Sequence, residues 1–236
     1  MDCRRNRRVA GVVEDVRADN APLNIHTWGD TILFASAFSW LMVPSSDNDL
    51  QCGRFDTIED HPVHHPKMET KHEVVFKRPY SPGHPPKVVA WLDKVDTNCA
   101  DLRIKVFVTD VTETGFTLWV NTSGDVQVYS AGASWFAHPA SRTDIASGEF
   151  NSEDDWRSER SPEEHCARIP FTGAQFRDPP RVFLAAKDMD FDGGRNLRLH
   201  PMSATDVTAD AMTWHLDTWA DTVMRTVGAV YIAFTA

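Results

Sequence analysis

The chain has 236 residues and a formal net charge of −10, from 34 acidic and 24 basic side chains. This acidic balance argues against nucleic acid or an anionic membrane surface as the main partner. No stretch approaches the ~18 consecutive apolar residues of a membrane span.

The cysteines and the N-terminus bear on the cellular compartment. Four cysteines (Cys3, Cys52, Cys99 and Cys166) form no Cys-x-x-Cys motif, so we expect neither a disulfide framework nor a zinc site. The N-terminus carries basic residues but only a very short apolar run, unlike a secretory signal. We therefore expect a cytoplasmic or non-classically exported protein.

The first marked feature in chain order is the stretch 26–40, HTWGDTILFASAFSW, which recurs twice in altered form. The copies are 121–135, NTSGDVQVYSAGASW, and 217–231, DTWADTVMRTVGAVY. Each holds Thr, Gly or Ala, Asp, an alternating apolar run and a final aromatic residue. Alternation is typical of a half-buried strand, so we expect Trp40 and Trp135 to lie in cores.

Further matches follow one register of 94 or 95 residues, which indicates tandem repeats. The matches are Asp15-Val16 with Asp110-Val111, Thr27 with Thr122, 53–57 with 148–152, 85–88 with 179–182, and 102–104 with 197–199. The predicted domains are a partial repeat at 1–42, a full repeat at 52–138 and a diverged repeat at 147–236. The first lacks the counterpart of 53–100, and about 35 residues cannot close a core alone. It either packs on a neighbour or belongs to a chain whose beginning was lost; we favour the latter.

The remaining elements read as β throughout. Alternation predicts strands at 102–108 and 116–120, and shorter ones at 88–92 and 126–130. Pro201 should shorten or bulge its strand, because proline cannot donate to a ladder. The polar runs 59–73 and 153–165 are predicted loops, and 188–193 a hairpin turn. Many short strands indicate a sandwich or barrel.

Five segments together resemble the H-type lectin domain, the fold of the snail agglutinin and of the discoidin C-terminal domain. They are 76–80 (FKRPY), 85–88 (PPKV), 98–106 (NCADLRIKV), 111–116 (VTETGF) and the repeated stretch ending at Trp40 or Trp135. The resemblance implies six-stranded antiparallel β-sandwiches that assemble as trimers, with sugar in the clefts between protomers.

The resemblance also implies which residues contact sugar. The family's strand arginine matches Arg103, Arg198 and Arg8. Its Trp matches Trp28 and Trp219, and the second repeat has Ser123 in place of the Trp. The next position holds Gly29, Gly124 or Ala220. The family's second aromatic residue matches Phe34 and Tyr129, and the third repeat has Arg225 in its place. Asp60 and Glu159 are guesses for a loop acid.

No single repeat keeps the complete set, but the losses are complementary. A cleft shared between two repeats could therefore contain the complete set of sugar-contacting residues, with Arg103 facing Trp28 and Phe34. Three fused repeats could in this way form the trimer within one chain. Homo-oligomerisation is the other arrangement that the family implies.

Each candidate also has a structural interpretation. The tryptophans could cap a core, Arg103 could be a solvated strand residue, and Asp30, Asp125 and Asp221 could form turns. The histidines of 61–65 (HPVHH) read as a solvated loop rather than a metal site. No GxSxG, P-loop or GxGxxG motif indicates an enzyme, and nothing places Asp154 and Asp155 in a cleft as a glycosidase pair.

The sequence thus predicts a lectin without catalysis, metal or cofactor. It would bind glycans or glycoproteins of the galactose or N-acetylgalactosamine type, through several weak sites, as in cell adhesion. The alternative is a protein-interaction or structural sandwich with a degenerate sugar site.

Overall fold

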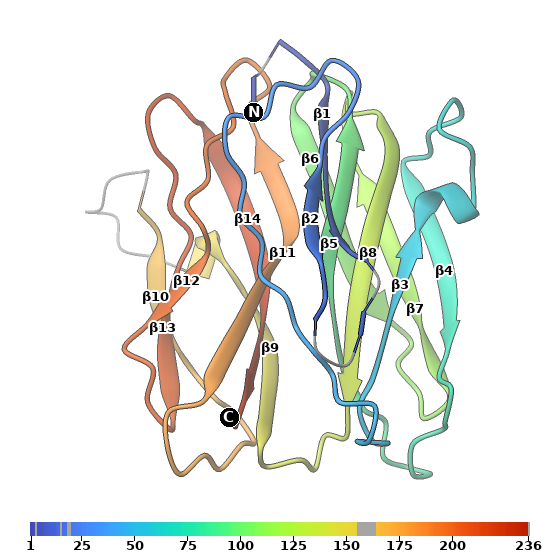
Figure 1. Cartoon of the computed structure of the whole chain (residues 1–236), viewed down its shortest axis with the longest axis vertical. Coiled ribbons are helices and arrows are strands. Elements are labelled where there is room, and N and C mark those ends of the chain that lie inside the picture. The colour runs from blue at the N-terminus through green and yellow to red at the C-terminus, as the bar shows by residue number, and fades with distance from the viewer. Residues whose placement is uncertain (3, 15, 18–19, 155–163, 236) are drawn as a thin grey trace.

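The computed structural model describes residues 1–2, 4–14, 16–17, 20–154 and 164–235. It confirms an all-β chain of tandem antiparallel sandwiches, two complete and one partial (Figure 1). In the described ranges the helical segments are two single 3-10 turns, η1 at Thr57–Glu59 and η2 at Ser152–Asp154. No helix there is long and apolar enough to cross a membrane.

The second repeat is a complete sandwich of six strands. One sheet has the order β3-β8-β5, and the facing sheet has the order β4-β7-β6. The bounds are β3 Gln51–Asp56, β4 Glu69–Val75, β5 Lys87–Thr97, β6 Leu102–Thr109, β7 Gly115–Thr122 and β8 Val128–His138. Pro85 and Pro86 precede β5, where a missing N–H donor costs no ladder hydrogen bond.

The third repeat has the same architecture, with sheets β9-β14-β11 and β10-β13-β12. The bounds are β9 Ile145–Asn151, β10 Cys166–Pro170, β11 Arg181–Phe191, β12 Ser203–Thr205, β13 Ala211–His215 and β14 Met224–Phe234. The shortening expected from Pro201 is confirmed, since β12 has three residues and Leu199 makes a lone bridge to Thr218.

The alternating residues form the core, as predicted. Ile104 and Val106 of β6 and Leu118 of β7 are completely or almost completely buried, and Trp135 of β8 faces them from the other sheet at 7% exposure. Each large apolar side chain buried in this way contributes about 1.5–3 kcal/mol. The expectation for Trp135 is confirmed.

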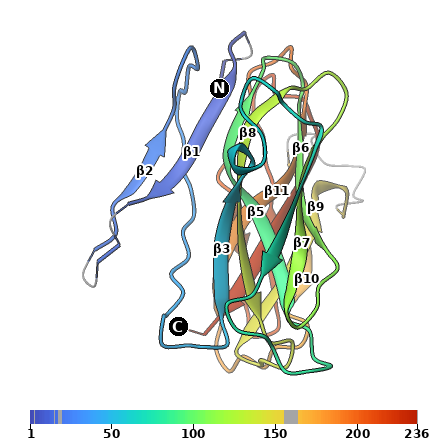
Figure 2. The ribbon, with the colours of Figure 1, turned by 90° about the vertical axis from the view of Figure 1, so that its right-hand side faces the viewer.

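The first repeat consists of β1 (Arg7–Val13) and β2 (Leu23–His26), followed by an extended segment without strand pairing. Figure 2 shows this hairpin standing out from the two complete sandwiches. The strand predicted within 26–40 does not form, and Trp40 is 54% exposed rather than buried. Its counterpart β8 pairs with both β5 and β3, and the described residues of the first repeat include no such partners.

Two turn or loop predictions were wrong in part. Glu69–Val75 forms strand β4 within the predicted loop 59–73, because Thr70 and Val74 point inward while the charged residues point outward. Within 188–193, the residues up to Phe191 belong to β11, and the turn starts only at Asp192. For the predicted loop 153–165, residues 155–163 lie outside the described ranges, as do Asp15 and Cys3.

The repeats join through their strand edges in a cyclic order. The strand β1 pairs with β5 of the second repeat, and the equivalent β6 pairs with β11 of the third. Met1 exchanges backbone hydrogen bonds with Leu197 of the third repeat, at 2.7 and 3.1 Å. A second apolar cluster, including Val89, Phe183 and Ile232, packs between the repeats. Each repeat therefore contacts both others within one chain.

Candidate functional site

An arginine lies at the edge of each repeat, where that repeat meets its neighbour. Arg8 on β1 is directly opposite Asp96 on β5, and Arg103 on β6 is directly opposite Asp190 on β11. The Nε–carboxylate distances are 3.1 Å and 3.5 Å, respectively. The pairing register of the sheets thus places one repeat's arginine beside the next repeat's aspartate.

A turn in the arginine's own repeat supplies a second carboxylate. Arg8 contacts Asp30, Arg103 contacts Asp125 at 3.4 Å, and Arg198 contacts Asp221, in each case through Nη1. The hydrogen bond from Arg8 lowers the pKa of Asp30, and that from Arg198 lowers the pKa of Asp221. The three Asp residues predicted from the repeat therefore occupy equivalent positions.

The residue before each of these aspartates has a left-handed backbone. The φ angles are 65° at Gly29, 70° at Gly124 and 59° at Ala220. A Cβ at Gly29 would lie 2.6 Å from Arg8 Nη1, and one at Gly124 would lie 2.4 Å from Arg103 Nη1. Glycine thus serves both the turn and the close approach of the guanidinium.

The position that matches the family's second aromatic residue lies in a β-bulge of the neighbouring repeat. Asp96 pairs with Ser130 and Thr97 with Val128, which leaves Tyr129 as the extra residue of β8. Arg225 is the extra residue at the equivalent place in β14. The bulge stands beside the aspartate that faces the arginine, and Arg225 contacts that aspartate, Asp190, at 2.8 Å.

The junction of the first and second repeats collects the fullest set. Trp28, Arg8 and Asp30 come from the first repeat, and Asp96 and Tyr129 from the second. Desolvation raises the pKa of Asp96, while the charge of Arg8 and hydrogen bonds from Arg8 and Trp28 act in the opposite direction. Trp28 and Tyr129 are both half-buried, so each keeps part of its ring accessible.

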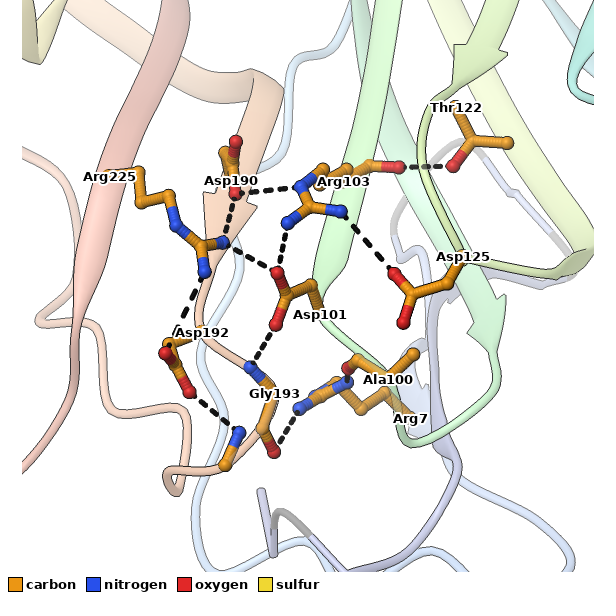
Figure 3. A network of polar contacts seen from close by, with 11 residues as sticks. Arg7, Ala100, Asp101, Arg103, Thr122, Asp125, Asp190, Asp192, Gly193 and Arg225 are labelled. Carbon is orange, nitrogen blue, oxygen red and sulfur yellow. Dashed lines mark hydrogen bonds and ion pairs between the residues drawn. The ribbon is translucent and has the colours of Figure 1, made fainter.

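The junction of the second and third repeats is an ionic network instead (Figure 3). Arg225 Nη1 lies 2.9 Å from Asp101 and 2.8 Å from Asp190, and these two carboxylates also contact Arg103. Ser123 replaces the tryptophan here. Desolvation alone would raise the pKa of Asp101, but the Gly193 N–H and the two arginines lower it.

The third repeat supplies the last arginine, Arg198, which contacts Asp221. Trp219 lies two residues before Asp221 and is 41% exposed. Trp219 contacts His200, with 4.5 Å between the ring centroids. Phe34 of the first repeat is equivalent to Tyr129 and is 63% exposed. Met1 pairs with Leu197 and so occupies the position equivalent to Thr97 and Phe191, which directly follow the aspartates that face Arg8 and Arg103.

These positions correct the predicted pairing of Arg103 with Trp28 and Phe34. Arg103 faces the third repeat, because β6 pairs with β11, whereas Trp28 reaches Asp96 of the second. Asp60 pairs with Lys67 at 2.6 Å, and Glu159 lies outside the described residues.

Sequence reasoning missed the neighbour's aspartates, Asp96 and Asp190. Both lie next to the last residue of the β5-type strand, at equivalent places, in VDT (95–97) and MDF (189–191). That match would have marked the position, but only the strand register reveals that it meets an arginine of the preceding repeat.

No metal centre is formed by the part of the chain that the structure describes, where His, Cys, Asp and Glu side chains nowhere gather in threes suitable for an ion. The loop interpretation of 61–65 needs one correction. His64 and His65 are exposed, but His61 is buried at 4% exposure, with Nδ1 3.4 Å from the Pro62 carbonyl oxygen.

Comparison with known families matches the H-type lectin domain twice, over residues 71–138 and 167–234. The two matches together cover more than half of the chain, and each lies within one of the two complete sandwiches. No curated protein matches the chain.

Proposed function

The chain belongs to the H-type lectin domain family, and we propose from this that it binds galactose-type glycans at the junction between its first and second repeats. The family is carbohydrate-binding and non-enzymatic. The observation that carries the location is the pair Arg8 and Asp96, which are joined across two repeats beside Trp28.

The chemistry of this cluster suits a sugar. An aromatic ring packs against the apolar C–H face of a pyranose, and Trp28 and Tyr129 supply two such rings. A rigid guanidinium beside a carboxylate can donate to and accept from neighbouring hydroxyls, which are costly to bury unpaired. Galactose and N-acetylgalactosamine present vicinal hydroxyls on one side of the ring, which matches the donor and acceptor of Arg8 and Asp96.

The test is a calorimetric titration of the full chain with N-acetylgalactosamine, followed by a glycan array. We expect weak binding, in the millimolar to high micromolar range, that Trp28→Ala reduces at least tenfold. Trp119→Ala is the matched control, because Trp119 lies on an outer sheet face and stacks on Phe107 at 6.0 Å between ring centroids. A folded wild-type chain that binds no sugar at millimolar concentration would contradict the proposed function.

The same titration tests the location. Arg8→Ala should abolish binding, whereas retention of affinity would move the site to another junction. In the second–third junction, Arg225 forms ion pairs where the first–second junction has Tyr129. We therefore propose that this junction holds the repeats together rather than binding sugar.

A further inference from the structure

Two of the three repeats carry a further arginine three residues before the arginine of the junction. The segments 5–8 (RNRR) and 195–198 (RNLR) align with each other, whereas the second repeat has ADLR at 100–103, with alanine in the equivalent place. Residues 4–8 hold four arginines, although the chain as a whole has a net charge of −10. The proposed sugar contacts of Arg8 do not account for this local positive charge.

The turn aspartate lies between two arginines in both of these repeats. Arg5 Nη1 is 4.0 Å from Asp30 Oδ2, and the other carboxylate oxygen of Asp30 contacts Arg8. The equivalent Arg195 Nη1 is 3.9 Å from Asp221 Oδ2, whose other oxygen again contacts the junction arginine of its repeat. Because the geometry recurs in two diverged repeats, it belongs to this turn and is not a chance surface contact.

The guanidinium of Arg5 is open to a ligand. Its 4.0 Å approach to Asp30 exceeds the length of a hydrogen bond, and no hydrogen bond within the described residues uses the Arg5 side chain. That side chain is 52% exposed, against 16% for Arg8, which contacts both Asp30 and Asp96. A guanidinium presents its donors in a rigid fork that matches the oxygens of a carboxylate or of a tetrahedral oxyanion. Arg5 is therefore suited to an anionic group.

The position of Arg5 places that anionic group at the rim of the proposed sugar site. Arg5 and Arg8 approach the two oxygens of one carboxylate, that of Asp30, and Arg8 also reaches Asp96 of the second repeat. The two guanidiniums are thus separated by the width of one carboxylate and its contacts, a span that a pyranose and one substituent can bridge. A sugar on Trp28, Arg8 and Asp96 can therefore extend a charged substituent to Arg5.

We propose that Arg5 is a specificity-determining residue of this site, which binds an anionic substituent, a sulfate ester or a carboxylate, on a galactose-type sugar. The inference rests on the proposed function, because it concerns the same junction. Trp28, Arg8 and Asp96 would hold the ring of a neutral or an acidic sugar alike. Only the acidic sugar would gain charge-assisted hydrogen bonds from Arg5, which are about twice as strong as neutral ones.

The test is calorimetric titration of the full chain with N-acetylgalactosamine, its 4-sulfate, its 6-sulfate and galacturonic acid. We expect at least one acidic sugar to bind about tenfold more tightly than N-acetylgalactosamine, the gain that one charge-assisted hydrogen bond supplies. The sugar that shows this gain identifies the substituent as sulfate or carboxylate. Arg5→Gln should bring the affinities for the acidic and the neutral sugar together.

The matched control is Arg4→Gln, which removes the same charge one residue away. The Arg4 side chain is 85% exposed and contacts Asp2 at 3.3 Å, so this variant should keep the preference for the acidic sugar. Equal loss of the preference in both variants would show that net charge alone is responsible and would overturn the proposal. Urea unfolding of the two variants checks that both are folded.

The titrations also separate this proposal from the proposed function. If the wild-type chain binds N-acetylgalactosamine but shows no preference for any acidic sugar, the role of Arg5 is wrong and the sugar site stands. If acidic sugars alone bind, and Arg5→Gln abolishes that binding, the role of Arg5 stands and neutral galactose is not the ligand. A folded chain that binds none of the four sugars would contradict both.

Discussion

At the scale of single residues, the turn beside each arginine shows how one backbone angle shapes a binding cluster. Gly29 and Gly124 adopt the left-handed conformation without strain, whereas Ala220 adopts it at φ 59° with a Cβ. A left-handed L-residue costs roughly 1–2 kcal/mol. The third repeat therefore carries a strain that the other two avoid.

We predict opposite effects for two exchanges at this position. Ala220→Gly should raise the free energy of unfolding by about 0.5–1 kcal/mol, after the greater entropy of glycine in the unfolded chain is subtracted. Gly29→Ala should lower it by at least as much, because its Cβ would lie 2.6 Å from Arg8 Nη1. Urea unfolding of both variants measures the difference, and a shift of the same sign in both would contradict the strain argument.

A buried histidine predicts how stability changes with pH. His138 bridges the second and third repeats, with Nε2 2.8 Å from Ser147 Oγ, and burial lowers its pKa from 6.5 to about 4. In the unfolded chain the His138 imidazole binds a proton near pH 6.5, whereas in the folded chain it does so only near pH 4. Stability is therefore lost as the pH falls through this window, by about 3 kcal/mol for the 2.5-unit difference.

The control for this prediction is His138→Gln, which cannot titrate but can still hydrogen bond. Urea unfolding at pH 7 and pH 4.5 should show a smaller loss in the variant than in the wild type, because other groups contribute equally to both. An identical loss in the two proteins would show that His138 does not titrate in this range.

At the scale of elements, equivalent strands carry ion pairs of inverted sign. Arg54 on β3 lies 3.0 Å from Asp93 on β5, and the equivalent strands β9 and β11 pair Glu149 with Lys187. Asp93 and Lys187 each stand at the register shift of their strand. The fold thus requires a matched pair at this bulge rather than a particular sign.

A charge swap tests this equivalence. Arg54→Glu alone should cost about 3 kcal/mol of unfolding free energy, because it leaves the largely buried Asp93 without its cation. Adding Asp93→Lys should recover at least half of that loss. Recovery will be incomplete, since Arg54 also contacts Asp56 at 3.1 Å. A double variant no more stable than the single one would show that the two bulges are not equivalent.

The strands that sequence could predict are those whose alternation and partners both lie within one repeat. Gly115–Thr122 is such a case, because it pairs with β4 and β6 of the same repeat. The stretch containing Trp40 has the same pattern as Val128–His138 but forms no strand, because a strand's stability depends on partners that its own sequence does not encode. The aromatic and arginine candidates could be found from the resemblance. Asp96 could not, since its role arises from pairing with a strand 88 residues away.

At the scale of the whole molecule, one chain arranges three versions of the same junction. In the first, Trp28 and Tyr129 accompany the arginine; in the second, Ser123 and Arg225 stand in those places. Because one chain contains all three, each junction can diverge separately, which identical subunits cannot do. One junction can then serve binding while another is held by ion pairs.

This division predicts that a second sugar site can be built. Ser123→Trp with Arg225→Tyr would give the second–third junction the aromatic residues of the first, while Arg103 and Asp190 remain in place. Calorimetry with N-acetylgalactosamine should then show one more site per chain. The loss of the Arg225 ion pairs to Asp101 and Asp190 should also make the free energy of unfolding less sensitive to salt. Trp28→Ala added to this double variant should remove the first site and leave the second. If the folded double variant gains no site, the aromatic pair does not distinguish the junctions, and sugar binding depends on features of the first repeat alone.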